Sequence, residues 1–120
     1  MIDKRALKRR YLETKTRAGV YAIKNQVNGR VLISGSTNAQ AAINRRRFEL
    51  KMGKHSIKSL RADWAEFGAD AFVFEVLDMV KHRDDPGFNL ADELNELVGL
   101  WQEEVDCPDE LNYRKIGKTP

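Results

Sequence analysis

The stretch GVYAIKNQVNGRVLIS, residues 19–34, contains the pattern from which the fold prediction starts. Residues 19–24 alternate, with Val20 and Ala22 on one face and Tyr21 and Ile23 on the other, which is typical of a β-strand. Asn28-Gly29 is a hairpin-turn signal, because both residue types tolerate positive φ. Residues 30–34 carry an apolar run typical of a buried return strand. The stretch therefore predicts a β-hairpin.

Helices and one further strand are predicted on either side of this hairpin. Helical spacing, capping residues and terminating glycines predict a basic helix over 3–15, a helix over 39–52 after the capping loop 35–38, and a second helix that Ser56 caps and Gly68 ends. Alternation over 72–80 predicts a third strand. Asn89 caps a last helix, whose apolar stripe consists of Leu90, Leu94, Leu97, Trp101 and Val105.

The predicted order of elements is therefore α-β-β-α-α-β-α, which is typical of a small α+β domain. A chain of 120 residues suits a single domain of this kind. We divide it into an N-terminal basic helix over 1–17, the domain over 18–114 and a tail over 115–120. No apolar run approaches the ~18 residues of a membrane-spanning helix, so we expect no membrane partner. One cysteine, Cys107, cannot form an internal disulfide, so we expect a cytoplasmic protein.

Charge is distributed unevenly along the chain, although the net charge is only +3. Residues 1–62 contain 16 Lys and Arg and 3 Asp and Glu, a net charge of +13. Residues 63–120 contain 5 Lys and Arg and 15 Asp and Glu, a net charge of −10. A half this basic favours a polyanion such as nucleic acid as a partner. The alternative is that the two halves fold against each other and neutralise their charges.

Several ordered motifs resemble the GIY-YIG nuclease domain. Gly19-Val20-Tyr21, followed after ten residues by Leu32-Ile33-Ser34, resembles the paired tripeptides of that family. The hairpin between them is similar almost residue for residue. Further similar segments follow in the same order: Lys54-His55-Ser56, Leu60 to Gly68, Phe72 to Asp78 and the leucine-rich helix around Trp101. The resemblance covers about residues 18 to 114 and implies a three-stranded antiparallel sheet flanked by helices.

The resemblance also implies a chemistry, the hydrolysis of a DNA phosphodiester. Active members hold one divalent metal, usually magnesium, through a glutamate on the closing helix, and two tyrosines, an arginine, a histidine and an asparagine assist. Such a metal neutralises the phosphate, and the arginine stabilises the charge of the transition state. The family positions carried over onto this chain are Tyr21, Leu32 for the second tyrosine, Ala42 for the arginine with Arg45 as stand-in, Arg46 for the histidine, Val98 for the glutamate, and Arg114 for the asparagine with Asn112 nearby.

The valine at position 98 removes the expected metal ligand, because Mg²⁺ normally needs a carboxylate oxygen from the protein. We therefore predict a GIY-YIG-fold protein that binds nucleic acid, with DNA favoured over RNA, and that does not cut it. No cofactor is expected, and Mg²⁺ only if the protein is an active nuclease. The predicted nucleic-acid-binding residues are Arg45, Arg46, Arg47, Lys51, Lys54, His55, Lys58 and Arg114.

Two alternatives remain open at this point. The first is an active nuclease that uses Tyr21, Arg45 and a relocated carboxylate such as Glu96 or Glu103. The second is a protein-interaction domain whose bipolar charge drives self-association. The resemblance further implies a bacterial or phage-like source.

Overall fold

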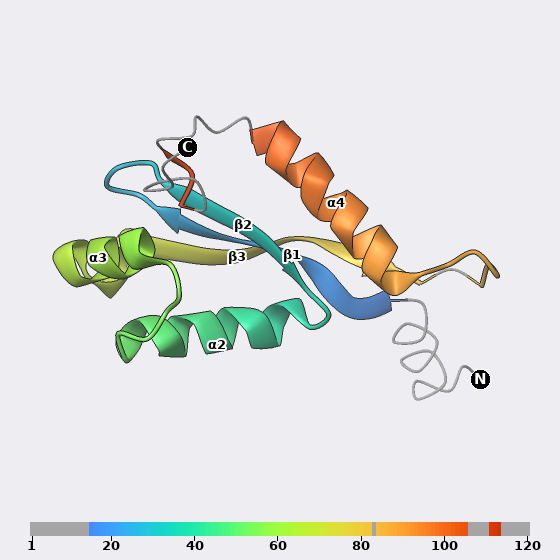
Figure 1. Ribbon diagram of the computed structural model, residues 1–120, viewed down its shortest axis with the longest axis horizontal. Helices are drawn as coiled ribbons and strands as arrows, with labels where there is room; N and C mark the ends of the chain where they lie inside the picture. The colour runs from blue at the N-terminus through green and yellow to red at the C-terminus, as the bar shows by residue number, and fades with distance from the viewer. Residues whose placement is uncertain (1–14, 83, 106–110, 114–120) are drawn as a thin grey trace, which may run out of the picture.

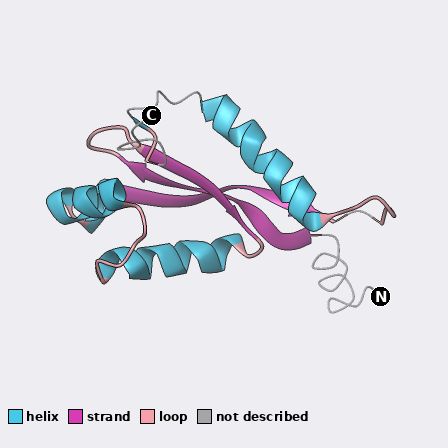
Figure 2. Ribbon diagram, viewed as in Figure 1, coloured by secondary structure: helices cyan, strands magenta, loops and turns pink. Residues whose placement is uncertain are grey.

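The computed structural model describes residues 15–82, 84–105 and 111–113, which form one layer of β-sheet between helices (Figure 1). The elements are β1 (Lys15–Asn25), β2 (Val31–Ser36), α2 (Ala39–Lys51), α3 (Lys58–Phe67), the short 3₁₀ helix η1 (Ala69–Ala71), β3 (Phe72–Lys81) and α4 (Leu90–Val105). The sheet has the order β2-β1-β3, and both pairs are antiparallel. The predicted α+β fold is confirmed (Figure 2).

The helices cover opposite faces of the sheet, α2 and α3 on one and α4 on the other (Figure 1). The alternation of β1 explains how both faces are built. Tyr21 and Ile23 pack in the cluster that includes α2 and α3, whereas Val20 and Ala22 pack in the cluster that includes α4. Since both faces are apolar, the central strand is buried on both sides.

The predicted hairpin is also confirmed, with Tyr21 paired to Ser34 across the two strands. The amide of Asn25 donates to the carbonyl of Arg30 (2.8 Å), and Gly29 has φ 77°, a left-handed conformation that suits glycine. Helix α4 also packs closely against β2, at Gly35. A Cβ atom on Gly35 would lie 2.6 Å from Cγ2 of Val98, so α4 packs this closely because Gly35 has no side chain.

Two details of the predicted elements are wrong. The N-terminal helix was predicted over 3–15 within the segment 1–17, but β1 already begins at Lys15 and pairs with Lys81 of β3. Residues 1–14 and the predicted tail over 115–120 lie outside the described residues. Ser56 does not cap α3; the N-cap is Ile57, whose amide donates to Nδ1 of His55 (3.1 Å). By contrast, Asn38 and Asn89 cap α2 and α4 as predicted, through the amides of Ala41 and Asp92.

Within residues 15–82, 84–105 and 111–113, none of the helices is long and apolar enough to cross a membrane.

Candidate functional site

A pocket of about 250 Å³ opens between the β1–β2 pair, α2 and the loop before α3. Its lining combines a few apolar side chains with hydroxyl, imidazole and guanidinium groups. The lining residues are Tyr21, Leu32, Ser34, Gly35, Ser36, Ala42, Arg46, His55, Ser56 and Ile57. None of these described lining residues is Asp or Glu, so the pocket presents hydrogen-bond donors and positive charge without a carboxylate.

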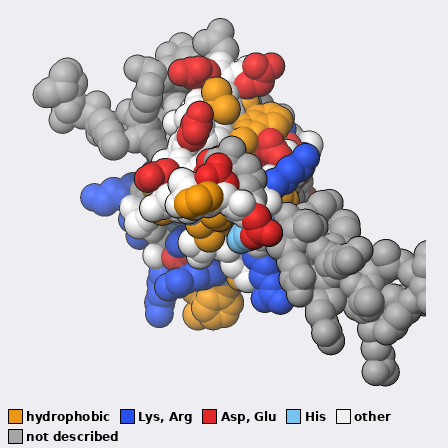
Figure 3. Space-filling model, turned by 90° about the vertical axis from the view of Figure 1, so that its right-hand side faces the viewer, with side chains coloured by type: hydrophobic (Ala, Val, Ile, Leu, Met, Phe, Trp, Pro, Cys, Tyr) orange, Lys and Arg blue, Asp and Glu red, His pale blue; other side chains and the backbone are white. Residues whose placement is uncertain are grey.

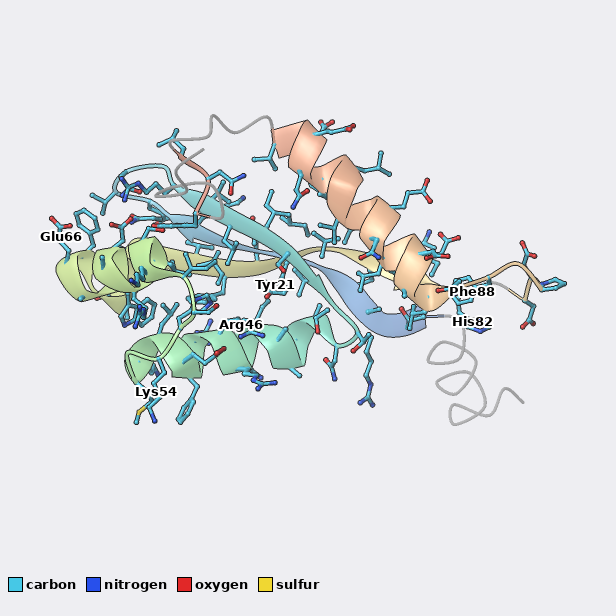
Figure 4. All side chains as sticks on the ribbon, in the orientation of Figure 1. Tyr21, Arg46, Lys54, Glu66, His82 and Phe88 are labelled. Carbon is cyan, nitrogen blue, oxygen red and sulfur yellow. The ribbon has the colours of Figure 1, made fainter. Side chains whose placement is uncertain are left out.

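Tyr21 and Arg46 meet in this pocket (Figure 4). The period of β1 directs Tyr21 to the α2 face, where it is 4% exposed. Arg46 follows Ala42 and Ile43 by one helical turn, which places it beside the apolar side of α2. Burial alone would lower the pKa of Arg46, but contacts with Tyr21 and Glu49 outweigh burial and raise the pKa above its ordinary value. A guanidinium held this way stays charged and is oriented toward the pocket.

His55, which we predicted as a nucleic-acid-binding residue beside Lys51, Lys54 and Lys58, lines the pocket. Unlike these lysines it is buried, with 3% of the residue exposed. Because its Nδ1 accepts a hydrogen bond from the amide of Ile57 (3.1 Å), the neutral ring carries its proton on Nε2. Its position in the Lys54-His55-Ser56 segment, which resembles the family, was the one available signal.

The other predicted binding residues lie around the pocket or outside the description. Arg45 is exposed and does not belong to the described lining, so Arg46 rather than Arg45 is the arginine beside Tyr21. Arg47 is also exposed, with its guanidinium carbon 4.7 Å from the centre of the Phe74 ring. Lys51, Lys54 and Lys58 are exposed on α2, the following loop and α3. Arg114 lies outside the described residues.

The residues at the pocket do not fit a divalent metal ion. Val98 packs with the α4 cluster that includes Val20 and Ile33, on the sheet face opposite Tyr21. The two candidate substitutes on α4, Glu96 and Glu103, are exposed and are not among the described residues of the pocket. In the described part of the chain, no group of three or more His, Cys, Asp or Glu side chains converges as a metal site. Hard cations such as Mg²⁺ need oxygen ligands, above all the carboxylates of Asp and Glu.

A second polar cluster, at the hairpin turn, was not predicted. Asp63 of α3 is 5% exposed and accepts hydrogen bonds from Asn28 (3.0 Å), Arg30 (3.0 Å) and Tyr113 (2.7 Å). The side-chain amide of Asn25 also donates to Asp63 (3.4 Å) and to the hydroxyl of Tyr113 (3.1 Å). We call Asn25, Asn28, Arg30, Asp63 and Tyr113 the Asp63 cluster. It fastens the turn, α3 and the segment 111–113 together.

Burial alone would raise the pKa of Asp63, but its hydrogen bonds outweigh that effect and lower the pKa below the ordinary value of 3.8. Burial and the neighbouring carboxylate raise the pKa of the Tyr113 hydroxyl. Both groups therefore keep their present charge at neutral pH, Asp63 ionised and Tyr113 neutral.

Comparison with known proteins identifies solved structures with this fold. No family model and no curated protein matches the chain. The structure of the catalytic domain of homing endonuclease I-TevI matches with a TM-score of 0.62 and 23% sequence identity, over 79% of this chain and 96% of that one. A mutant of the catalytic domain of intron endonuclease I-TevI matches with a TM-score of 0.64 and 22% identity, over 85% and 96%.

The chain therefore has a GIY-YIG-like fold. One solved domain that it resembles is the catalytic domain of I-TevI, and the likeness covers 96% of that domain. The predicted family resemblance is thus confirmed for the fold.

Proposed function

We propose that this protein binds the sugar-phosphate backbone of nucleic acid at the Tyr21–Arg46 pocket and does not cleave it through a bound metal. The single observation that carries the proposal is the character of the pocket. It holds a guanidinium, an imidazole and hydroxyl groups, and its described lining lacks carboxylates. A phosphate oxygen is the ligand that such a donor-rich, cationic pocket favours.

Arg46 is the central residue of this proposal. Its guanidinium contacts Tyr21 on one side and Glu49 on the other, so its position is set before a ligand arrives. Preorganised side chains lose less conformational freedom on binding. An arginine can also donate to two phosphate oxygens at once, which a lysine cannot do. The tyrosine and serine hydroxyls add donors that do not depend on charge.

Exposed basic residues extend the pocket into a longer surface. Arg45, Lys51, Lys54 and Lys58 lie on α2, the connecting loop and α3, the same side of the sheet as the pocket. Each phosphate that they neutralise releases condensed counterions and adds to the salt dependence of binding. The nuclease-domain neighbours also support nucleic acid, with DNA favoured, as the ligand.

The lack of metal cleavage is supported by position 98. A carboxylate at this position is what the family resemblance implies for metal binding, and Val98 supplies none. Val98 also packs against Gly35 and Leu94. The valine that stands in place of the family's glutamate therefore stabilises the packing of α4 on the sheet.

The experiment titrates the protein into three fluorescent ligands at several salt concentrations. They are a 20-base-pair DNA duplex, single-stranded DNA of the same length and an RNA duplex of the same sequence. We expect the protein to bind DNA, and the logarithm of the binding constant to fall linearly with the logarithm of the salt concentration. Supercoiled plasmid incubated with Mg²⁺ or Mn²⁺ is expected to stay intact. Absence of binding at low salt would contradict the proposal. Nicking that EDTA abolishes would instead support the active-nuclease alternative.

A further inference from the structure

An acidic groove of about 410 Å³ lies where α4 meets β3, apart from the Tyr21–Arg46 pocket. Its lining combines three large apolar side chains with three carboxylates. It is lined by Asp78, Leu97, Leu100, Trp101, Glu103 and Glu104, which we call the acidic groove. Leu100 is 55% exposed, and the indole N–H of Trp101 donates to Asp78 (3.1 Å), which fixes the ring as one wall. An exposed apolar surface rimmed by charge marks a site of interaction.

A ridge of the opposite character runs along the outer side of α2. Phe48 and Met52 are 63% and 53% exposed, although both are large and apolar. They share one face of the helix with Arg45, because residues three and four apart lie side by side, and Lys51 flanks them. All four side chains are exposed. We call Arg45, Phe48, Lys51 and Met52 the basic ridge.

The two surfaces point in opposite directions. The acidic groove is on α4 and the basic ridge is on α2, and these helices lie on opposite faces of the sheet (Figure 1). In the view of Figure 3, most acidic side chains gather toward the α4 side and most basic ones toward the α2 side, each with hydrophobic side chains among them. The two surfaces therefore have opposite charge, and both contain exposed apolar side chains. Because they lie on opposite faces, the ridge of one molecule cannot reach its own groove.

We propose that the basic ridge of one copy of this chain docks in the acidic groove of a second copy. Phe48 packs on Leu100 and Trp101, while Arg45 and Lys51 face Glu103 and Glu104. Such a contact joins two different surfaces, so each added copy leaves one ridge and one groove free. The assembly therefore grows beyond the dimer. This inference does not rest on the proposed function, but Arg45 and Lys51 belong to both surfaces, so nucleic acid and a second copy would compete for them.

The groove has six lining residues and the ridge has four, so we expect a small contact and a weak association that depends on salt. Interfaces below about 1,200 Å² are typical of transient complexes. The attraction between exposed charges acts over about 10 Å at 0.1 M salt and about 3 Å at 1 M. We therefore expect oligomers at high protein concentration and low salt, and monomers at 1 M salt.

Sedimentation velocity of the full chain over a range of concentrations tests this. At 50 mM salt we expect the weight-average sedimentation coefficient to rise with concentration past that of a dimer. Glu103→Lys/Glu104→Lys and, separately, Arg45→Glu/Lys51→Glu are each expected to weaken association at least tenfold. The matched control is Glu66→Lys/Asp70→Lys, which makes the same charge change at two exposed positions on α3 and η1 and should keep a concentration-dependent rise in sedimentation (Figure 4).

Mixing the two charge-reversed variants gives the sharpest outcome. The Glu103→Lys/Glu104→Lys protein keeps an intact ridge, and the Arg45→Glu/Lys51→Glu protein keeps an intact groove. An equal mixture should therefore associate where neither variant alone does, and because the reversed ridge and the reversed groove again carry opposite charges, the mixture can grow past the dimer. Phe48→Ala, which retains every charge, should also weaken the self-association of the otherwise unchanged chain at least tenfold while leaving DNA affinity unchanged.

Three results would overturn the proposal. One is a monomer at every concentration and salt. Another is a loss of association in Glu103→Lys/Glu104→Lys that is absent in Arg45→Glu/Lys51→Glu and in Phe48→Ala. That result would mean that a basic segment other than the ridge, such as residues 1–14, binds in the groove. The third is a mixture of the two charge-reversed variants that associates no better than either variant alone.

Discussion

The Asp63 cluster and the Tyr21–Arg46 pocket are both polar regions on the α2–α3 side of the sheet, yet they are built in opposite ways. In the cluster, one buried carboxylate receives hydrogen bonds from Asn28, Arg30 and Tyr113. In the pocket, Arg46 and the hydroxyl groups face a space of about 250 Å³ whose described lining has no carboxylate. One region is closed on itself, and the other is open and rich in donors.

This difference separates stability from function. A buried charge that is fully hydrogen-bonded within the protein has no capacity left for a ligand. A pocket with more donors than acceptors has capacity for an anion from outside. We therefore expect substitutions in the Asp63 cluster to change the free energy of unfolding and substitutions in the pocket to change binding. The following experiments test that separation, from the largest effect to the smallest.

Asp63→Asn is expected to have the largest effect on stability. It leaves Arg30 without its anion and places an amide N–H₂ group against other donors, so unfolding should become easier by about 3 kcal/mol, or roughly 10 °C in Tm. Thermal unfolding measures this. Asp70→Asn, an exposed carboxylate on η1, is the control and should change Tm little. DNA affinity of Asp63→Asn below its Tm should be unchanged; a tenfold loss would remove the distinction between the two regions.

The same carboxylate gives a stability that depends on pH. The pKa of Asp63 is lower in the folded protein than in the unfolded chain, where it is about 4. Its contribution is therefore fully present above about pH 5 and is lost as pH falls through the folded-state pKa. Urea unfolding from pH 7 to pH 3 should show the difference between the natural chain and Asp63→Asn narrowing below about pH 4. A constant difference would mean that the ionised form of Asp63 is not what stabilises the cluster.

Arg46→Ala should show the reverse pattern. Loss of a guanidinium that donates to phosphate should weaken DNA binding about tenfold, which is about 1.4 kcal/mol. Stability should fall by less than about 1 kcal/mol, since a partly exposed i,i+3 ion pair on one helix, such as that with Glu49, contributes little. Arg46→Lys should recover part of the affinity, because it keeps the charge without the planar fork. Equal affinity of Arg46→Ala and the natural protein would exclude the pocket as the binding site.

Lys58→Ala should have the smallest effect. Lys58 is exposed at the start of α3, so it would contribute long-range attraction rather than a fixed contact. We expect affinity to fall about twofold and the logarithmic salt slope to decrease by about one phosphate contact. Lys24→Ala is the matched control, because Lys24 pairs with Glu75 and points to the α4 face. A larger effect of Lys24→Ala than of Lys58→Ala would place the nucleic acid on the other face.

The sequence predicted most of the fold because the local signals agree with one another. The alternation of β1, the Asn28-Gly29 turn and the caps at Asn38 and Asn89 all correspond to observed features. The start of β1 was missed because Lys15 to Arg17 are polar, and their strand depends on pairing with the distant β3. The cap of α3 was predicted wrongly because Ser56 is a preferred capping residue type, but the helix begins one residue later, after Ile57, and has no side-chain cap.

The pocket was predicted in part. Arg46 was among the predicted binding residues and lines the pocket, because it follows Ala42 and Ile43 by one helical turn and so lies beside the apolar side of α2. The burial of His55 was not predicted, because it depends on the packing of the loop between α2 and α3, which has no sequence period. The Asp63 cluster was missed for a similar reason. Its members come from the hairpin, α3 and residues 111–113, up to 88 residues apart in the chain.

The most direct test of the proposed function is one binding titration, of labelled duplex DNA with the natural protein and Arg46→Ala, each in EDTA and in Mg²⁺. The proposal predicts that the natural protein binds equally well in both buffers, that Arg46→Ala binds about tenfold more weakly in both, and that the duplex is recovered uncut. Binding that requires Mg²⁺, or a duplex cut in Mg²⁺ alone, would contradict it.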